Sequence, residues 1–585
     1  MSKDTNPKGY LCLVLHGHLP YVVSHGSWPH GTDWLCEAAA ESYLPLARVL
    51  WRLVEQGFSP KISIGLTPVL VEQLRSADFA AEFRHYLAHK QESAHADMRD
   101  FRRQGDERAA RLAEGWGAFY QQAAEEFSSR WQDDLVGAFR SLQDLGHIEV
   151  LTSSATHAYL PLIGLDECVQ AQVRTGVESY RRQFGRDPRG FWLPECGYRP
   201  RYRWGPPFPQ TGLAPSLRKG VDEFLGEQGL HYFIVDSHLL EGGEALGVYR
   251  ERFEALARLW RVFSAQQRVR EKVEGTTAYE AYLVESSGEG KAPLAFFVRD
   301  PRTGLQVWSR EHGYPGDGWY LEFHKKRFPG GHRYWRVTSS QADLGAKELY
   351  EPERVQARVE ENADHFVSLV HDLLLRHWDE AGIPGVVCAP YDAELLGHWW
   401  FEGPEWLAAV VRKMAASEQV AMVTCDEYLE NVPAARLFAL PEGSWGEGGF
   451  HWVWLNEWTE WTWRHLYECE LKARRLAQAL GERQGEARRV VEQCLRELLL
   501  LESSDWQFLI TTWSARDYAE SRFSEHLEAF NRLAGLAEQA LSGKALSGPE
   551  REQLELYEQR DAPFAQVDPT WYARVAFPAT GARTG

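Results

Sequence analysis

The 585-residue sequence predicts an α/β fold built on a closed or nearly closed barrel of seven parallel strands, one short of the usual eight. Short apolar runs alternate with longer amphipathic stretches, which is the pattern of parallel strands covered by helices. The predicted strands are residues 10–15, 61–66, 148–152, 190–193, 232–235, 385–389 and 420–424. Helix-like segments lie between them, at residues 36–56, 166–183, 221–227, 354–376 and 405–417.

Polar, titratable residues follow six of the seven predicted strands. In strand order they are His16 with His18, residues 153–157 ending in His157, Glu195, Asp236 with His238, Asp392 with Glu394, and Asp426 with Glu427. The carboxyl ends of barrel strands gather at one rim, where active sites are built. The sequence therefore predicts a functional site at this rim.

Two of these carboxylates, Glu195 and Asp392, suggest sugar chemistry. Glu195 follows the strand at 190–193 among aromatic residues, and Asp392 follows the strand at 385–389. Two carboxylates across a rim can share a glycosidic bond, one attacking the anomeric carbon and the other protonating the leaving oxygen, at about 5–6 Å for a retaining enzyme. Glu394 is a rival acid, although a carboxylate at a helix N-terminus is the favoured interpretation.

His16 and His18 allow two interpretations. They alternate with Gly17, so in an extended strand both side chains point the same way. Either they bind a metal completed by Asp236 or His238, as in sugar deacetylases, or they hydrogen-bond sugar hydroxyls and orient the carboxylates. No third ligand has a diagnostic spacing, so we expect catalysis without a metal.

Composition narrows the function further. The 24 tryptophans favour carbohydrate stacking or a large aromatic core. A net charge of −19 argues against nucleic acid and anionic membranes as partners. The polar start of the chain shows no secretory signal, and the eight cysteines form no CxxC pair, which together predict a reduced, cytoplasmic protein.

Two long insertions interrupt the alternation of strands and helices, and the last part of the chain has only helical patterns. We expect a catalytic barrel over residues 1–440, with a helical insertion at about 74–145 and an inserted lid segment at about 241–341. Glycine-rich residues 446–449 then precede tryptophans at 452, 454, 458, 461 and 463, followed by long helix-period stretches. Residues 447–570 are predicted to form an α-helical domain that completes the substrate groove.

Five ordered motifs are similar to those of glycoside hydrolase family 57. They are His16-Gly-His-Leu-Pro20, Gly65-Leu-Thr-Pro68, Trp192-Leu-Pro-Glu-Cys-Gly-Tyr198, Ala389-Pro-Tyr-Asp-Ala-Glu-Leu-Leu-Gly-His-Trp-Trp400 and Leu501-Glu-Ser-Ser-Asp-Trp506. Three further stretches resemble the 1,4-α-glucan branching enzymes of that family: Leu305-Gln-Val-Trp-Ser309, Gly313-Tyr-Pro-Gly-Asp317 and Pro441-Glu-Gly-Ser-Trp445. The resemblance covers nearly the whole chain.

The resemblance implies a (β/α)7 barrel and a retaining mechanism without metal or cofactor. It implies Glu195 as the nucleophile and Asp392 as the acid/base. It places His16, His18 and His157 around the sugar that is attacked, and a loop-tip tyrosine, Tyr249 or the competing Tyr279, over the site. The other residues expected to contact glucan are Trp28, Trp319, Trp400, Trp454, Trp461, Trp463 and Asp505.

The predicted activity is transfer of an α-1,4-glucan chain to a glucose 6-hydroxyl, which forms an α-1,6 branch. An α-amylase or a 4-α-glucanotransferase on the same barrel is the near alternative, because only the acceptor differs. A metal-dependent sugar deacetylase is more distant. A non-enzymatic glucan-binding module would keep the tryptophans without needing paired carboxylates.

Overall fold

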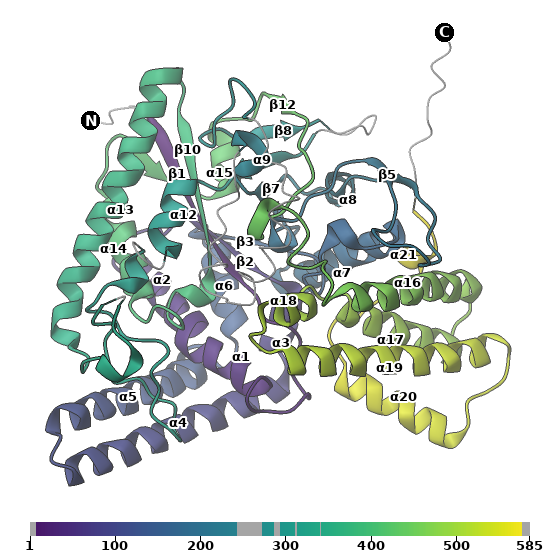
Figure 1. The fold of residues 1–585 in the computed structure, drawn as a ribbon, viewed down its shortest axis with the longest axis horizontal. Coiled ribbons are helices and arrows are strands. Elements are labelled where there is room, and N and C mark those ends of the chain that lie inside the picture. The colour runs from purple at the N-terminus through teal and green to yellow at the C-terminus, as the bar shows by residue number, and fades with distance from the viewer. Residues whose placement is uncertain (1–6, 243–271, 286–292, 310–312, 340, 576–585) are drawn as a thin grey trace.

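The computed structural model describes residues 7–242, 272–285, 293–309, 313–339 and 341–575. Its centre is a ring of seven parallel strands (Figure 1). In ring order these are β1 (Gly9–Gly17), β2 (Ile62–Leu66), β3 (Ile148–Leu151), β4 (Gly190–Phe191), β7 (Tyr232–Val235), β9 (Ala295–Val298) and β10 (Gly385–Asp392). Single bridges, Thr152 to Phe191 and Arg299 to Cys388, join β3 to β4 and β9 to β10 and close the ring. The predicted barrel is confirmed.

One predicted barrel strand was wrong. Residues 420–424 form β11 (Val420–Met422), which pairs with the first residues of β1, outside the ring, and β9 takes the expected seventh place. Asp426 and Glu427 consequently lie at the opposite end of the barrel from the rim. Asp426 contacts His231, just before β7, at 3.1 Å, and Glu427 contacts Lys61, just before β2. The alternation rule left β9 out of the ring because its four apolar residues lie inside the second long insertion.

Helices cover the outside of the ring. Their apolar faces pack on the strands, and α7 and α13 both end at a glycine in the left-handed region, Gly185 and Gly382, which a residue with a Cβ disfavours. The barrel helices are α1 (Thr32–Ala38), α2 (Leu44–Glu55), α3 (Pro68–Leu74), α6 (Leu135–Asp144), α7 (Asp166–Phe184), α8 (Val221–Glu227), α13 (Pro352–Ala381), α14 (Gly403–Ala415) and α15 (Cys425–Asn431).

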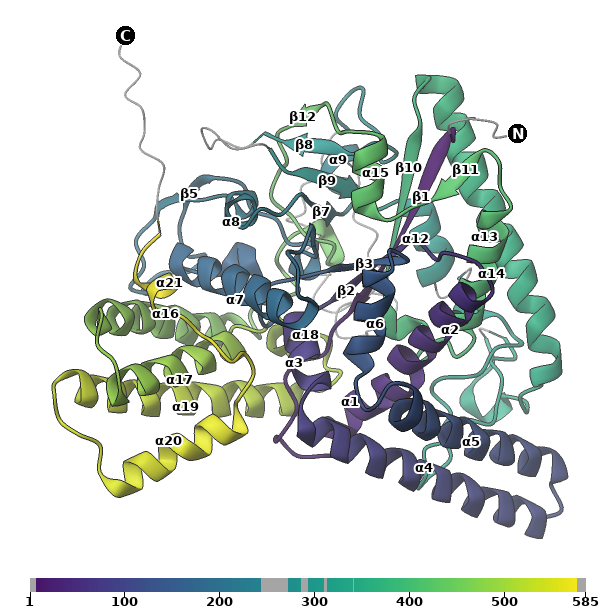
Figure 2. The same ribbon diagram turned by 180° about the vertical axis from the view of Figure 1, so that it is seen from behind.

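Helices α4 (Ala77–Arg103) and α5 (Glu107–Glu125) form an antiparallel hairpin that lies beyond α1 and α2 in both views (Figures 1 and 2). The Ser76 hydroxyl caps α4 by accepting the Phe79 N–H. The hairpin is tied to residues 327–334, because Trp116 donates to the Arg333 carbonyl at 2.6 Å and Lys90 donates to the Gly330 carbonyl at 2.9 Å.

The second insertion contributes more than a lid. Besides β9 it supplies β8 (Tyr282–Val284), which runs antiparallel to β9 and pairs with β12 (Leu437–Phe438). Residues 334–337 form only single bridges. The remaining small elements are α9 (His238–Glu241), α12 (Pro301–Trp308) and the hairpin of β5 (Tyr202–Trp204) with β6 (Ser216–Arg218).

A helical bundle lies beside the barrel, next to α7 (Figure 1). It contains α16 (Glu460–Leu480), α17 (Glu486–Leu501), α18 (Asp505–Thr512), α19 (Arg516–Leu541), α20 (Gly548–Arg560) and α21 (Thr570–Ala573). The short helix α18 begins at the barrel rim, where its first residue, Asp505, contacts His18. Among the described residues, every helix is too short or too polar to cross a bilayer.

Candidate active site

Glu195 lies in the short helical turn Pro194–Cys196, which follows β4 after Trp192 and Leu193. Its φ of 59° is in the left-handed region, which non-glycine residues adopt at a cost and which is concentrated at functional sites. Trp445 holds the residue at two points. Its indole Nε1 donates to Glu195 Oε2 at 2.7 Å, and its backbone N–H donates to the Glu195 carbonyl at 3.1 Å.

The surroundings of Glu195 favour its protonated form. The side chain is 13% exposed, and burial raises the pKa of its carboxyl to about 8. The hydrogen bond from Trp445 lowers the pKa, while the negative charges of Asp392 and Asp505 raise it. The site thus combines a desolvated carboxyl with a donor that stabilises its anion.

Asp392 is the last residue of β10 and lies in register with His16 of β1. Its charge raises the pKa of both Glu195 and Glu394, so the three carboxyls share one electrostatic environment. Glu394 is buried, and its carboxylate accepts the backbone N–H of His18 at 3.0 Å and the Tyr43 hydroxyl. Glu394 lies in the short helical turn Ala393–Leu395, as expected, and its hydrogen bond to the His18 N–H fixes the chain after β1.

Three histidines line one side of the site. His16 stacks on Trp192 with ring centroids 4.4 Å apart, and its Nε2 lies 3.1 Å from His157 Nε2. His18 stacks on His157 at 4.0 Å between centroids. Burial, followed by the neighbouring histidine charges, lowers the pKa of His16 and His157 well below the usual range, so both rings are neutral at pH 7.

The helical bundle supplies the partners of these histidines. Asp505, the first residue of α18, contacts His18 Nε2 at 2.9 Å, and the Ser504 hydroxyl contacts His157 Nδ1 at 3.1 Å. Thr67, just after β2, contacts His18 Nδ1 at 2.9 Å. Ser504, Thr67 and Trp445 were not predicted as site residues, although all three lie inside motifs visible in the sequence.

The two residues expected to complete a metal site with His16 and His18 have other partners. Asp236 accepts a hydrogen bond from Arg299 Nε at 2.8 Å and contacts His238 Nδ1 at 3.1 Å, while His238 Nε2 contacts the Gly449 carbonyl. Among the described residues, the two groups with metal-like spacing lie elsewhere: His25, His526 and Asp561, and Glu37, Glu41 and His398.

Three tryptophans expected to contact glucan are core residues instead. Trp400, Trp454 and Trp463 are 1%, 0% and 1% exposed, so their faces are covered by protein. Trp454 stacks on Tyr159 at 4.4 Å, and Trp463 Nε1 donates to the Trp454 carbonyl. The sequence alone does not distinguish an aromatic cluster that packs in a core from one that lines a groove, because large aromatic side chains occur in both.

The other expected contact residues differ in their exposure. Trp28, in the loop after β1, is 77% exposed, whereas Trp319 has the guanidinium groups of Arg336 and Arg354 over its ring. Trp461 is half-buried against Phe523.

The two tyrosines proposed for the loop tip have different outcomes. Tyr249 lies outside the described residues. The Tyr279 carbonyl accepts the Val386 N–H at the start of β10, at the opposite end of that strand from Asp392. Tyr279 is therefore wrong as a residue over the site.

Comparison with known proteins agrees with this geometry. A family model described as glycosyl hydrolase family 57 matches residues 12–441, and one described as 1,4-alpha-glucan branching enzyme, C-terminal, matches residues 465–572. A 1,4-alpha-glucan branching enzyme of Thermococcus kodakarensis is 42% identical over 561 residues, which are 96% of this chain and 78% of that protein.

Solved structures give the same result. The crystal structure of that Thermococcus enzyme, described as a branching enzyme of this family in complex with glucose, matches with a TM-score of 0.87 and 40% identity over 98% of both chains. The α-amylase AmyC of Thermotoga maritima matches with a TM-score of 0.77 and 28% identity, over 97% of this chain and 100% of that one. The chain belongs to glycosyl hydrolase family 57, and within it to the 1,4-alpha-glucan branching enzymes.

Proposed function

We propose that this enzyme forms α-1,6 branches by double displacement, with Glu195 as the nucleophile and Asp392 as the acid/base. The observation that carries the assignment is the pairing of Glu195 with Trp445, whose indole N–H donates at 2.7 Å to the carboxylate oxygen. A nucleophile must be an anion when it attacks, and a hydrogen-bond donor aimed at it favours that form.

In the first step, a Glu195 oxygen forms a bond to the anomeric carbon of an α-1,4-glucan while the bond to the glycosidic oxygen breaks. Asp392 gives its proton to that oxygen, and the reducing-end fragment leaves. In the second step, Asp392 takes the proton of an acceptor 6-hydroxyl, whose oxygen displaces Glu195 from the anomeric carbon. Two inversions restore the α configuration.

The carboxyl pair must hold one proton at the start of each cycle. Burial, with a smaller contribution from the charges of Asp392 and Asp505, raises the pKa of Glu195 to about 8, so the pair retains a proton at neutral pH. For the reaction, substrate binding must move this proton to Asp392, so that Glu195 attacks as the anion.

The neutral histidines supply the sugar-binding side of the site. A neutral imidazole both donates and accepts, which suits a sugar hydroxyl. Ser504 and Asp505 fix the rings of His157 and His18, so this side of the site is oriented before the substrate arrives.

We infer that the substrate is an intracellular α-glucan such as glycogen. All eight cysteines are buried free thiols, which supports a reducing, cytoplasmic setting.

The test is to incubate amylose with the enzyme and count α-1,6 linkages and new reducing ends by proton NMR. Branching gives linkages well in excess of reducing ends. The Glu195→Gln variant, which keeps the shape but not the nucleophile, is expected to lose at least about 1,000-fold in rate. New reducing ends without α-1,6 linkages would instead indicate an α-amylase, the activity named for the Thermotoga relative.

A further inference from the structure

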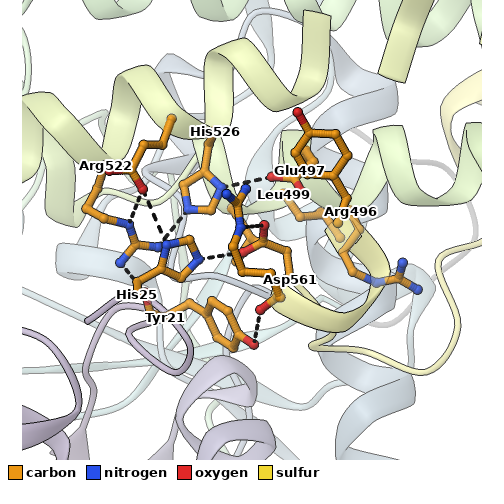
Figure 3. Close-up of polar contacts among 12 residues, drawn as sticks. Tyr21, His25, Arg496, Glu497, Leu499, Arg522, His526 and Asp561 are labelled. Carbon is orange, nitrogen blue, oxygen red and sulfur yellow. Dashed lines mark hydrogen bonds and ion pairs between the residues drawn. The ribbon is translucent and has the colours of Figure 1, made fainter. Parts of the chain in front are cut away.

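A buried polar cluster outside the site joins the loop after β1 to the helical bundle (Figure 3). The loop contributes Tyr21 and His25, α17 contributes Glu497, α19 contributes Arg522 and His526, and Asp561 follows α20. Buried charged groups are costly unless they are paired, so a cluster of this kind needs an explanation.

His25 lies between two carboxylates. Its Nε2 is 2.6 Å from Asp561 Oδ1 and its Nδ1 is 3.4 Å from Glu525 Oε2, while the His25 side chain is 2% exposed. Burial alone would raise the pKa of Asp561, but the hydrogen bond from His25 and the charge of Arg560 hold it well below its usual range.

His526 is fixed as a neutral ring. Arg522 NH2 donates to its Nε2 at 2.8 Å, so the ring proton is on Nδ1 and points to Glu497 Oε2 at 2.9 Å. His25, His526 and Asp561 offer ligand atoms within 4.8 Å of one another, as a metal site would. Both nitrogens of His526 are already bonded, however, and the cation beside it is the guanidinium of Arg522.

The cluster leads directly to the sugar-binding histidines. Arg522 NH1 donates to the Tyr21 carbonyl at 2.8 Å, and its guanidinium lies over the ring of Trp506 at 5.3 Å. Trp506 follows Asp505, which contacts His18. The loop that carries His18 out of β1 and the helix that holds His18 in place are thus both fixed by the same buried cluster.

We propose that His25 is a positioning residue: its contacts with Asp561 and Glu525 clamp the loop after β1 to the helical bundle and so keep Ser504 and Asp505 against the catalytic-site histidines. The interpretation of its effect on rate rests on the proposed branching function. The clamp itself does not, because it is defined by contacts between His25, Asp561 and Glu525.

The kinetic test compares His25→Gln and Asp561→Asn with His324→Gln as the matched control. His324 is a histidine that contacts a carboxylate, Glu322, at 2.9 Å but is mostly exposed. We expect kcat on amylose to fall about 10- to 100-fold in both clamp variants, since small displacements of positioning groups have effects of this size, with KM changing less. The double variant should be no worse than either single variant.

The structural readout is histidine NMR on the 15N-labelled enzyme. The His18 and His157 signals of His25→Gln and Asp561→Asn should be displaced from those of the wild type, whereas those of His324→Gln should not. Folded clamp variants with wild-type kcat, KM and histidine signals would overturn the proposal. If the wild type forms no α-1,6 linkages but the histidine signals are displaced in the clamp variants, the proposed function fails while the clamp stands.

Discussion

At the scale of single residues, the site depends on two side chains placed by unusual backbone. Glu195 and His157 both have φ values in the left-handed region, 59° and 57°, and the Nδ1 of His157 lies 3.9 Å from Glu195 Oε1. Such conformations persist only where the surrounding structure enforces them, here through Trp445 and Ser504. Their clustering around one carboxylate supports its role as the nucleophile.

The pH dependence of the rate should report the carboxyl pair. Because the pKa of Glu195 is raised to about 8, the state that holds one proton persists through neutral pH and is lost as pH rises past that value. We expect kcat/KM for amylose to fall above about pH 8. In Asp392→Asn the charge that raises this pKa is gone, so carbon-13 NMR of Glu195 should show titration at a lower pH. An unchanged titration would mean that the two carboxyls do not interact.

Trp445→Phe tests the donor to Glu195. The hydrogen bond lowers the pKa of Glu195, so its removal should raise that pKa further and disfavour the attacking anion. A hydrogen bond to a charged group contributes about 1.5–3 kcal/mol, which corresponds to a loss of about 10- to 100-fold in kcat. Trp335→Phe, which changes a half-buried indole in the second insertion, is the control and should keep wild-type kcat. Equal losses in both variants would point to general destabilisation.

At the scale of elements, β1 and the turn after β3 supply the three histidines that form one wall of the site, and Ser504 and Asp505 at the start of α18 contact two of them. β1 pairs with β10 on one side and β2 on the other, which brings His16 beside Asp392 and His18 beside Thr67. α18 begins at this wall, because the chain just before it forms an antiparallel bridge between Ser503 and Ala158. The wall therefore combines residues of the barrel with residues of the bundle, which are far apart in the sequence but meet at the rim.

Chelation tests whether the wall holds a metal. His16 and His157 face each other nitrogen to nitrogen at 3.1 Å, and the expected third ligand, Asp236, is bonded to Arg299. We expect branching activity to survive dialysis against EDTA. Activity lost to EDTA and restored by zinc would contradict this prediction and favour the deacetylase alternative.

At the scale of the whole molecule, the barrel and the helical bundle form one site. Glu195 and Asp392 come from the barrel, whereas Ser504 and Asp505 come from the bundle. A glycosyl-enzyme on Glu195 is open to attack by water, so transfer requires that water be excluded and an acceptor chain be held ready. The segment after β7, which contains Tyr249, follows a rim residue and is the part of the chain expected to supply that cover.

Tyr249→Ala tests that expectation. We expect the fold to be retained, branching to fall sharply and hydrolysis to rise as a fraction of turnover, because water gains access to the intermediate. The measurement is the ratio of new α-1,6 linkages to new reducing ends. Tyr279→Ala is the control, since Tyr279 lies at the start of β10, away from the rim. An unchanged ratio in Tyr249→Ala would mean that another part of the molecule excludes water.

The sequence by itself determined the class of barrel, the rim on which the site lies and the residues at most strand ends. Those features follow from local patterns: hydrophobic runs of strand length, a proline just before Glu195, and polar residues after six of the seven predicted strands. Local patterns could not tell β9 from an inserted strand, nor β11 from a member of the ring, because ring membership depends on pairing between distant segments.

Only the tertiary structure decided which aromatic and polar residues serve the site. Trp400, Trp454 and Trp463 are buried, while Trp445, never singled out, donates to Glu195. Burial and hydrogen-bond partners depend on residues hundreds of positions apart, as in the contact of His18 with Asp505. The physical reason is that a side chain's chemistry is set by what surrounds it, and that environment is assembled only when the bundle packs on the barrel.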